Sequence, residues 1–222
     1  MMPYKSKIMV LAAHPDDEVL GIGGTLIKFK EKYKCTINIE FLTTTPSCDR
    51  WRKAKKISEI LGSSINRPDC VIDKDMAPLT LEKNLTKTIA EYITKRIDII
   101  KPDFILTHYG NDLNNDHSKI SEATLVACRP YLTSHNIKGV FQYEVPSSTE
   151  QNLQNIFNPD IFIEIDDLTW DKKVKLIDIY DKEIKDYPHP RSKKGIDTLA
   201  CYRGVHVGYK RAEALKTMWR KI

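Results

Sequence analysis

Residues 7–18 have the sequence KIMVLAAHPDDE. After Lys7 the first part is apolar, which predicts a buried β-strand over residues 7–12. The polar segment HPDDE begins where this strand ends, and open α/β sheets bind their ligands at the carboxyl ends of parallel strands. The stretch therefore predicts both a strand of a parallel sheet and a functional site at its end.

The rest of the first half alternates β-branched runs with longer helical patterns, which is typical of βαβ units and a parallel sheet. A polar, glycine-containing turn over residues 14–24 precedes the first helix. Gly62 and the Lys101-Pro102 pair are expected to end the next two helices. The expected strands lie at 36–44, 70–73 and 103–108, and the expected helices at 25–33, 50–61 and 81–100.

The second half has a weaker pattern of the same kind. A polar loop leads into a helix at 118–129, with Asp116 or Ser118 near its N-cap. No repeat, low-complexity tract or linker divides the chain, so we expect a single domain over residues 1–222. The remaining expected elements are a strand at 161–165, a helix at 170–180, and a loop at 187–195 before a final helical region.

The 222 residues carry 35 Lys and Arg against 30 Asp and Glu, a net charge of +5. Because these charges are spread along amphipathic stretches, nucleic acid is not an expected partner. The five cysteines form no CxxC pair and are odd in number, which disfavours a disulfide framework and favours a reducing cytoplasm. No apolar run reaches about 18 residues, so we expect neither a signal peptide nor a membrane span.

His14 and Asp17 lie close together on one turn and are suited to bind the same metal ion. A catalytic zinc usually has three protein ligands and keeps one position for water, so the third ligand must come from another strand end. His117 ends the loop LTHYGNDLNNDH, which follows a second buried strand. Two histidines and an aspartate predict one Zn²⁺ ion, although iron and manganese accept the same ligands. The alternative is that His14 and Asp17 only cap a helix or form a surface hydrogen bond.

Two more acids lie beside these ligands. Asp16 is the expected general base, because a carboxylate next to a metal-activated water can take its proton. The alternative for Asp16 is a helix-capping or solvent-facing acid. Two roles stay open for Asp116, which either accepts a proton from a histidine ring nitrogen or caps its helix.

The glycines of GIGG at residues 21–24 invite comparison with a nucleotide-binding loop. Gly21 and Gly23 are followed by Leu26 where a dinucleotide fingerprint has its third glycine, so that function is disfavoured. We expect the glycines to let the turn pack close to the metal-binding loop.

With these motifs in place, the chain resembles the LmbE-like, or PIG-L, family of zinc-dependent N-acetylglucosaminyl deacetylases. AHPDDE followed by GxGG, and the later NDLNNDH, match the two motifs of the family. Similarity continues through RWRKAKKISEILG, YEVPSS, FNPDIFIEI, HPRS and CYRGVHVGYKRAEAL, which covers nearly the whole chain. The resemblance implies a Rossmann-like α/β fold, a mostly parallel sheet with helices on both faces. It also implies His14, Asp17 and His117 as ligands and Asp16 as the base.

Substrate contacts follow from the same resemblance. By analogy Arg50 meets a polar or anionic part of the substrate, and Asp112 faces the substrate; the alternative for Arg50 is a solvated helix residue. Many relatives have a histidine where this chain has Asn114. Asparagine donates a hydrogen bond but cannot shuttle a proton. Either the base therefore also serves as the acid, or His189 or His206 reaches into the site.

We therefore expect a cytoplasmic zinc-dependent hydrolase that removes the acetyl group from an N-acetylated amino sugar or sugar conjugate, in cell-surface glycan or glycoconjugate metabolism. One alternative is amide hydrolysis on a thiol-sugar or an antibiotic precursor. Another is a carbohydrate-binding module without catalysis. The resemblance to relatives that assemble also suggests a homo-oligomer.

Overall fold

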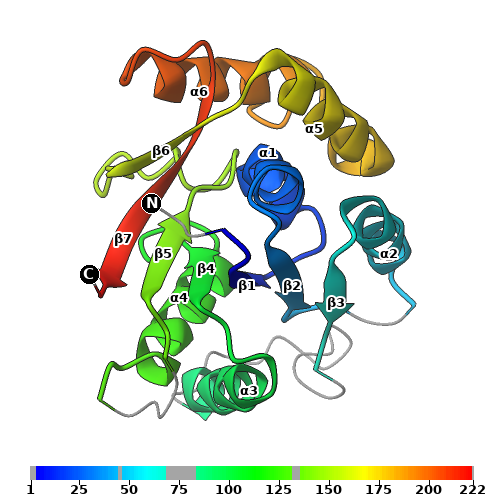
Figure 1. Ribbon diagram of the computed structural model, residues 1–222. Coiled ribbons are helices and arrows are strands. Elements are labelled where there is room, and N and C mark those ends of the chain that lie inside the picture. Colours follow the sequence, from blue (N-terminus) through cyan, green and yellow to red (C-terminus); the bar gives the residue numbers. More distant parts are fainter. Residues whose placement is uncertain (1–3, 45–46, 69–83, 132–135, 222) are drawn as a thin grey trace.

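The computed structural model describes residues 4–44, 47–68, 84–131 and 136–221. Its centre is a seven-stranded sheet in the order β3-β2-β1-β4-β5-β7-β6 (Figure 1). The strands β1 to β5 are mutually parallel, whereas β7 is antiparallel to both of its neighbours. The strands are β1 (Lys7–Ala12), β2 (Thr36–Phe41), β3 (Ser64–Asn66), β4 (Phe104–His108), β5 (Gly139–Tyr143), β6 (Ile161–Glu164) and β7 (Ala212–Arg220).

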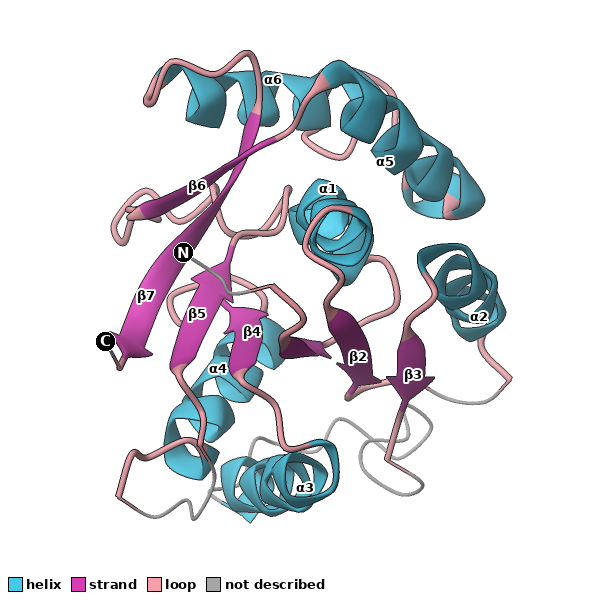
Figure 2. Ribbon diagram, in the orientation of Figure 1, coloured by secondary structure: helices cyan, strands magenta, loops and turns pink. Residues whose placement is uncertain are grey.

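Helices cover both faces of this sheet (Figure 2). Side chains alternate along a strand, so Ile8 and Val10 of β1 enter one core cluster while Met9 and Leu11 enter the other. One face is covered by α3 and α4, and α1, α2, α5 and α6 lie on the other side of the sheet (Figure 1). The helices are α1 (Asp17–Glu31), α2 (Asp49–Leu61), α3 (Asn84–Ile100), α4 (Asn115–Ala127), α5 (Asp167–Ile179) and α6 (Lys193–Val205).

The strand order changes direction between β1 and β4. From β1 the chain continues through α1 to β2 on one side, while β4 pairs with β1 on the other side and continues through α4 to β5. The two connecting helices therefore cover opposite faces of the sheet. Open α/β sheets bind ligands at such a switch point, at the carboxyl ends of the strands. Both predicted metal-binding loops begin there, after β1 and after β4.

The helix α1 starts at Asp17, well before the predicted position, and it includes the glycine segment that was expected to form a turn. A Cβ atom at Gly21 would lie 2.6 Å from the carbonyl oxygen of Glu144, and one at Gly24 would lie 2.8 Å from Ile165. Real Cβ atoms essentially never come so close to another heavy atom. The glycines therefore let a helix, rather than a turn, approach the segments that follow β5 and β6.

A buried ion pair bridges a break in α1. Ile22 has non-helical backbone angles (φ −135°, ψ 21°), so nearby backbone groups lack partners within the helix. Lys173 of α5 donates to the carbonyl oxygen of Leu20 at 3.0 Å, and Glu213 of β7 accepts from two N–H groups beyond the break at 2.9 and 2.6 Å. Lys173 and Glu213 are both buried, and Lys173 Nζ lies 2.6 Å from Glu213 Oε1. The pair thus holds both halves of α1, including the first turn that carries Asp17.

The strand β7 lies where the sequence predicts only a final helical region. The helix α6 confirms part of that prediction, but the following segment AEALKTMWR forms a strand that pairs with both β5 and β6. Its Ala, Glu and Lys residues have low strand propensity, so pairing within the sheet overrides the local preference. The strand predicted at 70–73 lies outside the described residues.

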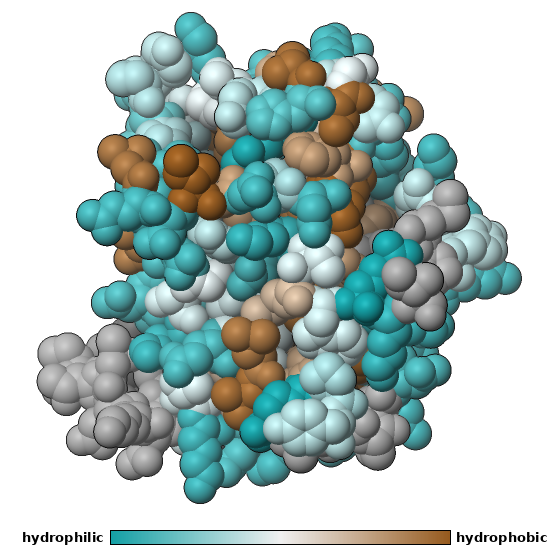
Figure 3. Space-filling view, turned by 90° about the vertical axis from the view of Figure 1, so that its left-hand side faces the viewer, coloured by the Kyte–Doolittle hydropathy of each residue, from teal (hydrophilic) through white to brown (hydrophobic). Residues whose placement is uncertain are grey.

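Among the described residues, no helix combines the length and the apolar character needed to cross a bilayer. On the side of the molecule that carries β6 and β7, hydrophobic residues are interspersed with hydrophilic ones (Figure 3).

Two glycine substitutions test the close packing of α1. Gly21→Ala should lower the free energy of unfolding by about 1–3 kcal/mol, because the new methyl group meets the backbone of Glu144. Gly23→Ala is the matched control, since its Cβ would have only ordinary contacts from 3.4 Å outward, and alanine favours a helix. Denaturant unfolding measures both variants, and equal losses of stability would contradict this account.

Candidate metal centre

The loop after β1 presents His14, Asp16 and Asp17 at the carboxyl edge of the sheet. The backbone N–H of His14 donates to Asp17 Oδ2 at 2.8 Å, which closes a tight turn. Asp16 has a φ of 137°, a value that a residue with a side chain adopts only at a cost of order 1–3 kcal/mol. In this turn the carboxylates of Asp16 and Asp17 reach different partners, so the two acids are available for different functions.

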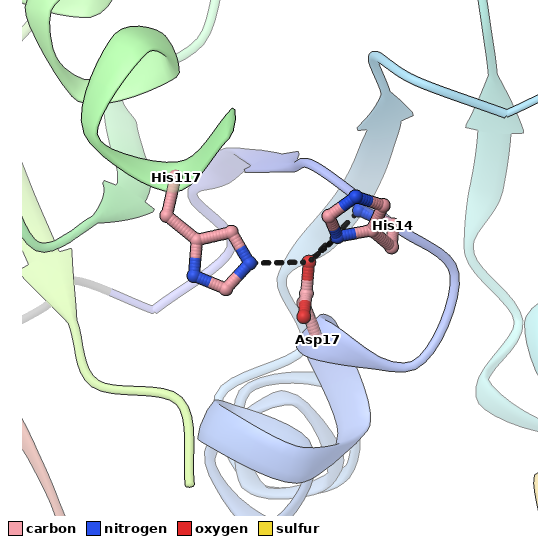
Figure 4. A group of neighbouring side chains, drawn as sticks. All are labelled: His14, Asp17 and His117. Atoms are coloured by element: carbon pink, nitrogen blue, oxygen red, sulfur yellow. Dashed lines mark hydrogen bonds and ion pairs between the residues drawn. The ribbon is translucent and has the colours of Figure 1, made fainter. Parts of the chain in front are cut away.

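The loop after β4 positions His117. Asn114 caps α4, because its side chain accepts the N–H of Asp116 at 2.9 Å. The helix therefore begins at Asn115, three residues before the predicted start. His117 lies in the first turn of α4 and is fully buried. From there its ring points toward the loop after β1 (Figure 4).

The side chains of His14, Asp17 and His117 converge from two distant segments (Figure 4). Their ligand atoms all lie within 4.8 Å of one another. Asp17 Oδ2 is 3.3 Å from His14 Nδ1 and 3.2 Å from His117 Nε2. Two imidazole nitrogens and one carboxylate oxygen therefore face a common point, and this is a set of donors that binds zinc in proteins.

Two further carboxylates orient the histidine rings. His14 Nε2 lies 2.9 Å from Asp116 Oδ2, and His117 Nδ1 lies 3.2 Å from Asp112 Oδ2. Each ring thus has one nitrogen beside an acid and the other facing Asp17, as is usual for histidines that bind metals. The side chain of Asp116 therefore pairs with a ring nitrogen of His14, which is one of the two roles considered for it, whereas Asn114 caps the helix.

The burial and charge of this group fit a divalent cation. Asp17 Oδ1 and His117 Nε2 are buried without a hydrogen-bond partner among the described residues. Burial lowers the pKa of His14, but hydrogen bonds with Asp116 and Asp17 outweigh it and raise the pKa to about 9. Burial likewise lowers the pKa of His117, while Asp17 and Asp112 raise it to about 10. The acids therefore favour positive charge here, and a divalent ion would supply that charge while the rings stay neutral.

Asp16 is buried and faces two arginines. Its Oδ2 lies 3.3 Å from Arg191 and 3.6 Å from Arg50, whereas its Oδ1 has no hydrogen-bond partner in the described part of the chain. Burial and the neighbouring Asp17 raise the pKa of Asp16 to about 7, although the two arginines lower it. A cation held by the three ligands would lower it further. A carboxyl group in this position is suited to taking up a proton and giving it away.

Asp112 has a different place from the one that the resemblance implied. Asp112 is buried, and its Oδ2 faces His117. The same oxygen accepts hydrogen bonds from the hydroxyls of Ser148 and Thr149. Its Oδ1 accepts the N–H of Asn114 at 2.8 Å. These contacts occupy both oxygens, which corrects the expectation that Asp112 faces the substrate. Its carboxylate instead holds the ring of His117.

Neither histidine considered as a second proton donor joins the metal-binding group. His206 follows α6, where its ring packs against Tyr202 and Phe162 with centroids 4.6 and 6.0 Å away. The helix α6 has 13 residues, which corresponds to about 20 Å, and Arg191 lies near its other end. The ring contacts of His206 are therefore with Tyr202 and Phe162, and its expected contact with the substrate stays a prediction. His189 is exposed, and its Nδ1 accepts the N–H of Arg191 at 3.0 Å.

The structure also adds residues that the sequence did not single out. His108, the last residue of β4, stacks on His117 with ring centroids 3.9 Å apart. Glu18 accepts the backbone N–H of Asp16 at 3.0 Å and so supports the strained turn. Arg191 reaches Asp16 from the loop before α6. These three residues belong to the motifs LTH, HPDDE and HPRS, and this membership was the only indication in the sequence. Their contacts with the site depend on the fold.

The geometry agrees with a comparison of the chain with known families. Residues 9–128 match the family described as GlcNAc-PI de-N-acetylase, or PIG-L. The match covers more than half of the 222 residues and includes both metal-binding loops. The chain therefore belongs to the PIG-L, or LmbE-like, family of deacetylases.

Individual relatives are distant in sequence but similar in fold. Over 158 residues the chain is 25% identical to the uncharacterized deacetylase YaiS of Escherichia coli K12, covering 68% of this chain and 80% of YaiS. The A40926 pseudoaglycone deacetylase Dbv21 superimposes with a TM-score of 0.77 at 17% identity, covering 98% of this chain and 99% of Dbv21. The N,N'-diacetylchitobiose deacetylase from Pyrococcus horikoshii gives a TM-score of 0.71 at 17% identity, with coverages of 96% and 84%. At such identities the structural likeness establishes the fold.

Replacing Asp112 by Asn should weaken Zn²⁺ binding by about 10- to 100-fold, because the ring of His117 loses the acid that orients it. Competition with a chelator measures the affinity. Asp178→Asn is the control, since it removes only an exposed ion pair with Lys193 and should bind zinc like the wild type. Equal affinities of the two variants would refute the orienting role of Asp112.

Proposed function

We propose that this protein is a metal-dependent hydrolase that removes the acetyl group from an N-acetylated amino sugar or sugar conjugate, releasing acetate and a free amine. The observation that carries the proposal is the convergence of His14, Asp17 and His117 next to the buried carboxylate of Asp16. Membership of a deacetylase family supports the reaction type.

Zinc is the proposed metal, and iron or manganese is the alternative. His14 would bind it through Nδ1 and His117 through Nε2, because their other ring nitrogens lie beside Asp116 and Asp112. Asp17 would supply a carboxylate oxygen. A bound divalent ion lowers the pKa of water toward about 7 and stabilises negative charge on a carbonyl oxygen.

Asp16 is the proposed general base. Arg191 and Arg50 contact its Oδ2, so the carboxylate is held in place while Oδ1 stays available for the proton of the attacking water. Asn114 cannot move a proton and is engaged as a helix cap. The same carboxyl group is therefore proposed to give the proton to the departing amine, so that Asp16 serves as base and then as acid.

The substrate is proposed to approach past Arg50, in the first turn of α2, and Asn114, at the N-cap of α4, which are both partly exposed. The guanidinium of Arg50 can bind a hydroxyl or an anionic group of a sugar. The names of two relatives, a diacetylchitobiose deacetylase and a pseudoaglycone deacetylase, support N-acetylated sugars as the substrate class and keep an antibiotic precursor as the alternative. A thiol-sugar amide is a further alternative substrate, and its hydrolysis is the same reaction.

The cytoplasmic location and the homo-oligomer stay predictions. The cysteines that the structure describes, at positions 35, 48, 128 and 201, are all free thiols. No nucleic acid partner is proposed, because the basic residues are spread along the chain.

Acetate release from a panel of N-acetylated sugars, with zinc-loaded protein, tests the function. Asp16→Asn should retain one zinc per chain but lose turnover by about 100-fold or more, because the proton acceptor is gone. His14→Ala should lose both the metal and the acetate release, since a ligand is removed.

The outcomes separate the candidate functions. Unchanged turnover of Asp16→Asn would require a different base. A zinc-replete wild type that binds sugars but releases no acetate after long incubation would instead support a carbohydrate-binding module without catalysis.

A further inference from the structure

His108 lies between the two metal-binding loops without being one of the three predicted ligands. It is the last residue of β4, between β1 and β5 in the sheet, and it is fully buried. One of its neighbours is Tyr143 of β5, with ring centroids 4.8 Å apart. A polar ring that is fully buried at the end of a central strand calls for an explanation from its contacts.

The face of the His108 ring supports the ring of His117. The two centroids are 3.9 Å apart and the planes differ by 11°, so the rings are stacked. Asp112 holds one edge of the His117 ring through Nδ1, but a contact at one atom leaves the ring free to rotate about it. The stack with His108 fixes the plane of the ring and therefore the direction in which His117 Nε2 points.

The Nε2 atom of His108 holds the other loop. It accepts the backbone N–H of Ala13 at 2.8 Å, and this amide directly precedes the predicted ligand His14. The hydroxyl of Tyr143, 3.3 Å from the same nitrogen, has a carbonyl acceptor in Leu11 at 2.9 Å. The lone pair of His108 Nε2 is thus used by the backbone and is not available to a metal ion.

We propose that His108 is a positioning residue, which fixes His117 through its ring face and the backbone before His14 through Nε2, so that the ligands from both loops meet at one point. This inference rests on the proposed metal site and adds a residue that acts on it without binding the ion. Because His108 Nε2 accepts the hydrogen bond from the N–H of Ala13, the proton of the neutral ring lies on Nδ1.

Two substitutions separate the two contacts. His108→Phe keeps a ring that can stack on His117 but cannot accept the N–H of Ala13, whereas His108→Gln keeps an acceptor but has no ring. Each variant should weaken Zn²⁺ affinity by about 10- to 100-fold in a chelator competition, as is typical when a group behind a metal ligand is removed.

The control is Thr107→Val, one position earlier on β4. Thr107 is also fully buried, and its hydroxyl bonds with that of Thr124 at 3.0 Å, away from the ligands. This variant should lower the melting temperature of the metal-free protein and leave the zinc affinity within about twofold of the wild type. If both His108 variants likewise had a lower melting temperature but bound zinc with the affinity of the wild type, His108 would be a packing residue and the proposal would be wrong.

A measurement on the wild type does not depend on how the variants fold. Long-range ¹⁵N–¹H correlation spectra should show His108 as the tautomer with its proton on Nδ1, both before and after addition of one equivalent of zinc. A zinc-induced shift that identified His108 Nε2 as a ligand would overturn the proposal. If the wild type bound no zinc at all, the proposed function would fail, while the tautomer in the metal-free protein would still test the bond from Ala13.

Discussion

The carboxylate of Asp17 is the group on which the rest of the site depends. It is fully buried, and burial alone would raise its pKa, yet His117 and His14 hold the pKa well below the usual value. A charged acid in the interior requires opposite charge at short range. The neighbouring histidine rings provide this positive charge only in part, because His14 and His117 each also face an acid of their own. A divalent cation between the three side chains would satisfy this whole arrangement.

The fold brings these groups together through the order of its strands. β1 and β4 are neighbours although almost a hundred residues separate them in the chain, so the loops after them meet at one edge of the sheet. The glycines of α1 and the buried Lys173–Glu213 pair then hold the first turn of that helix close to β5 and β7. Parts of the structure far from the metal-binding loops thus contribute to placing Asp17.

The sequence predicted what depends on local pattern. The alternation of strands and helices predicted the parallel sheet. The polar segments at two strand ends predicted His14, Asp17 and His117 as metal ligands. What it could not predict depends on contacts between distant segments. The roles of Asp112 and Arg191 arise from the partners His117 and Asp16, which only the folded chain supplies. Most residues of the strand β7 favour helices, and the early start of α1 contradicts the usual effect of glycine.

X-ray absorption spectroscopy at the zinc edge of the loaded protein tests the central claim most directly. We expect one zinc per chain, with a first shell of nitrogen and oxygen at about 2.0–2.2 Å and with the outer-shell scattering of two imidazoles. We also expect His14→Ala and His117→Ala to lose the bound zinc, because each variant lacks one of the three ligands. A first shell with sulfur at about 2.3 Å, or a spectrum with no imidazole scattering, would contradict the assignment of these ligands.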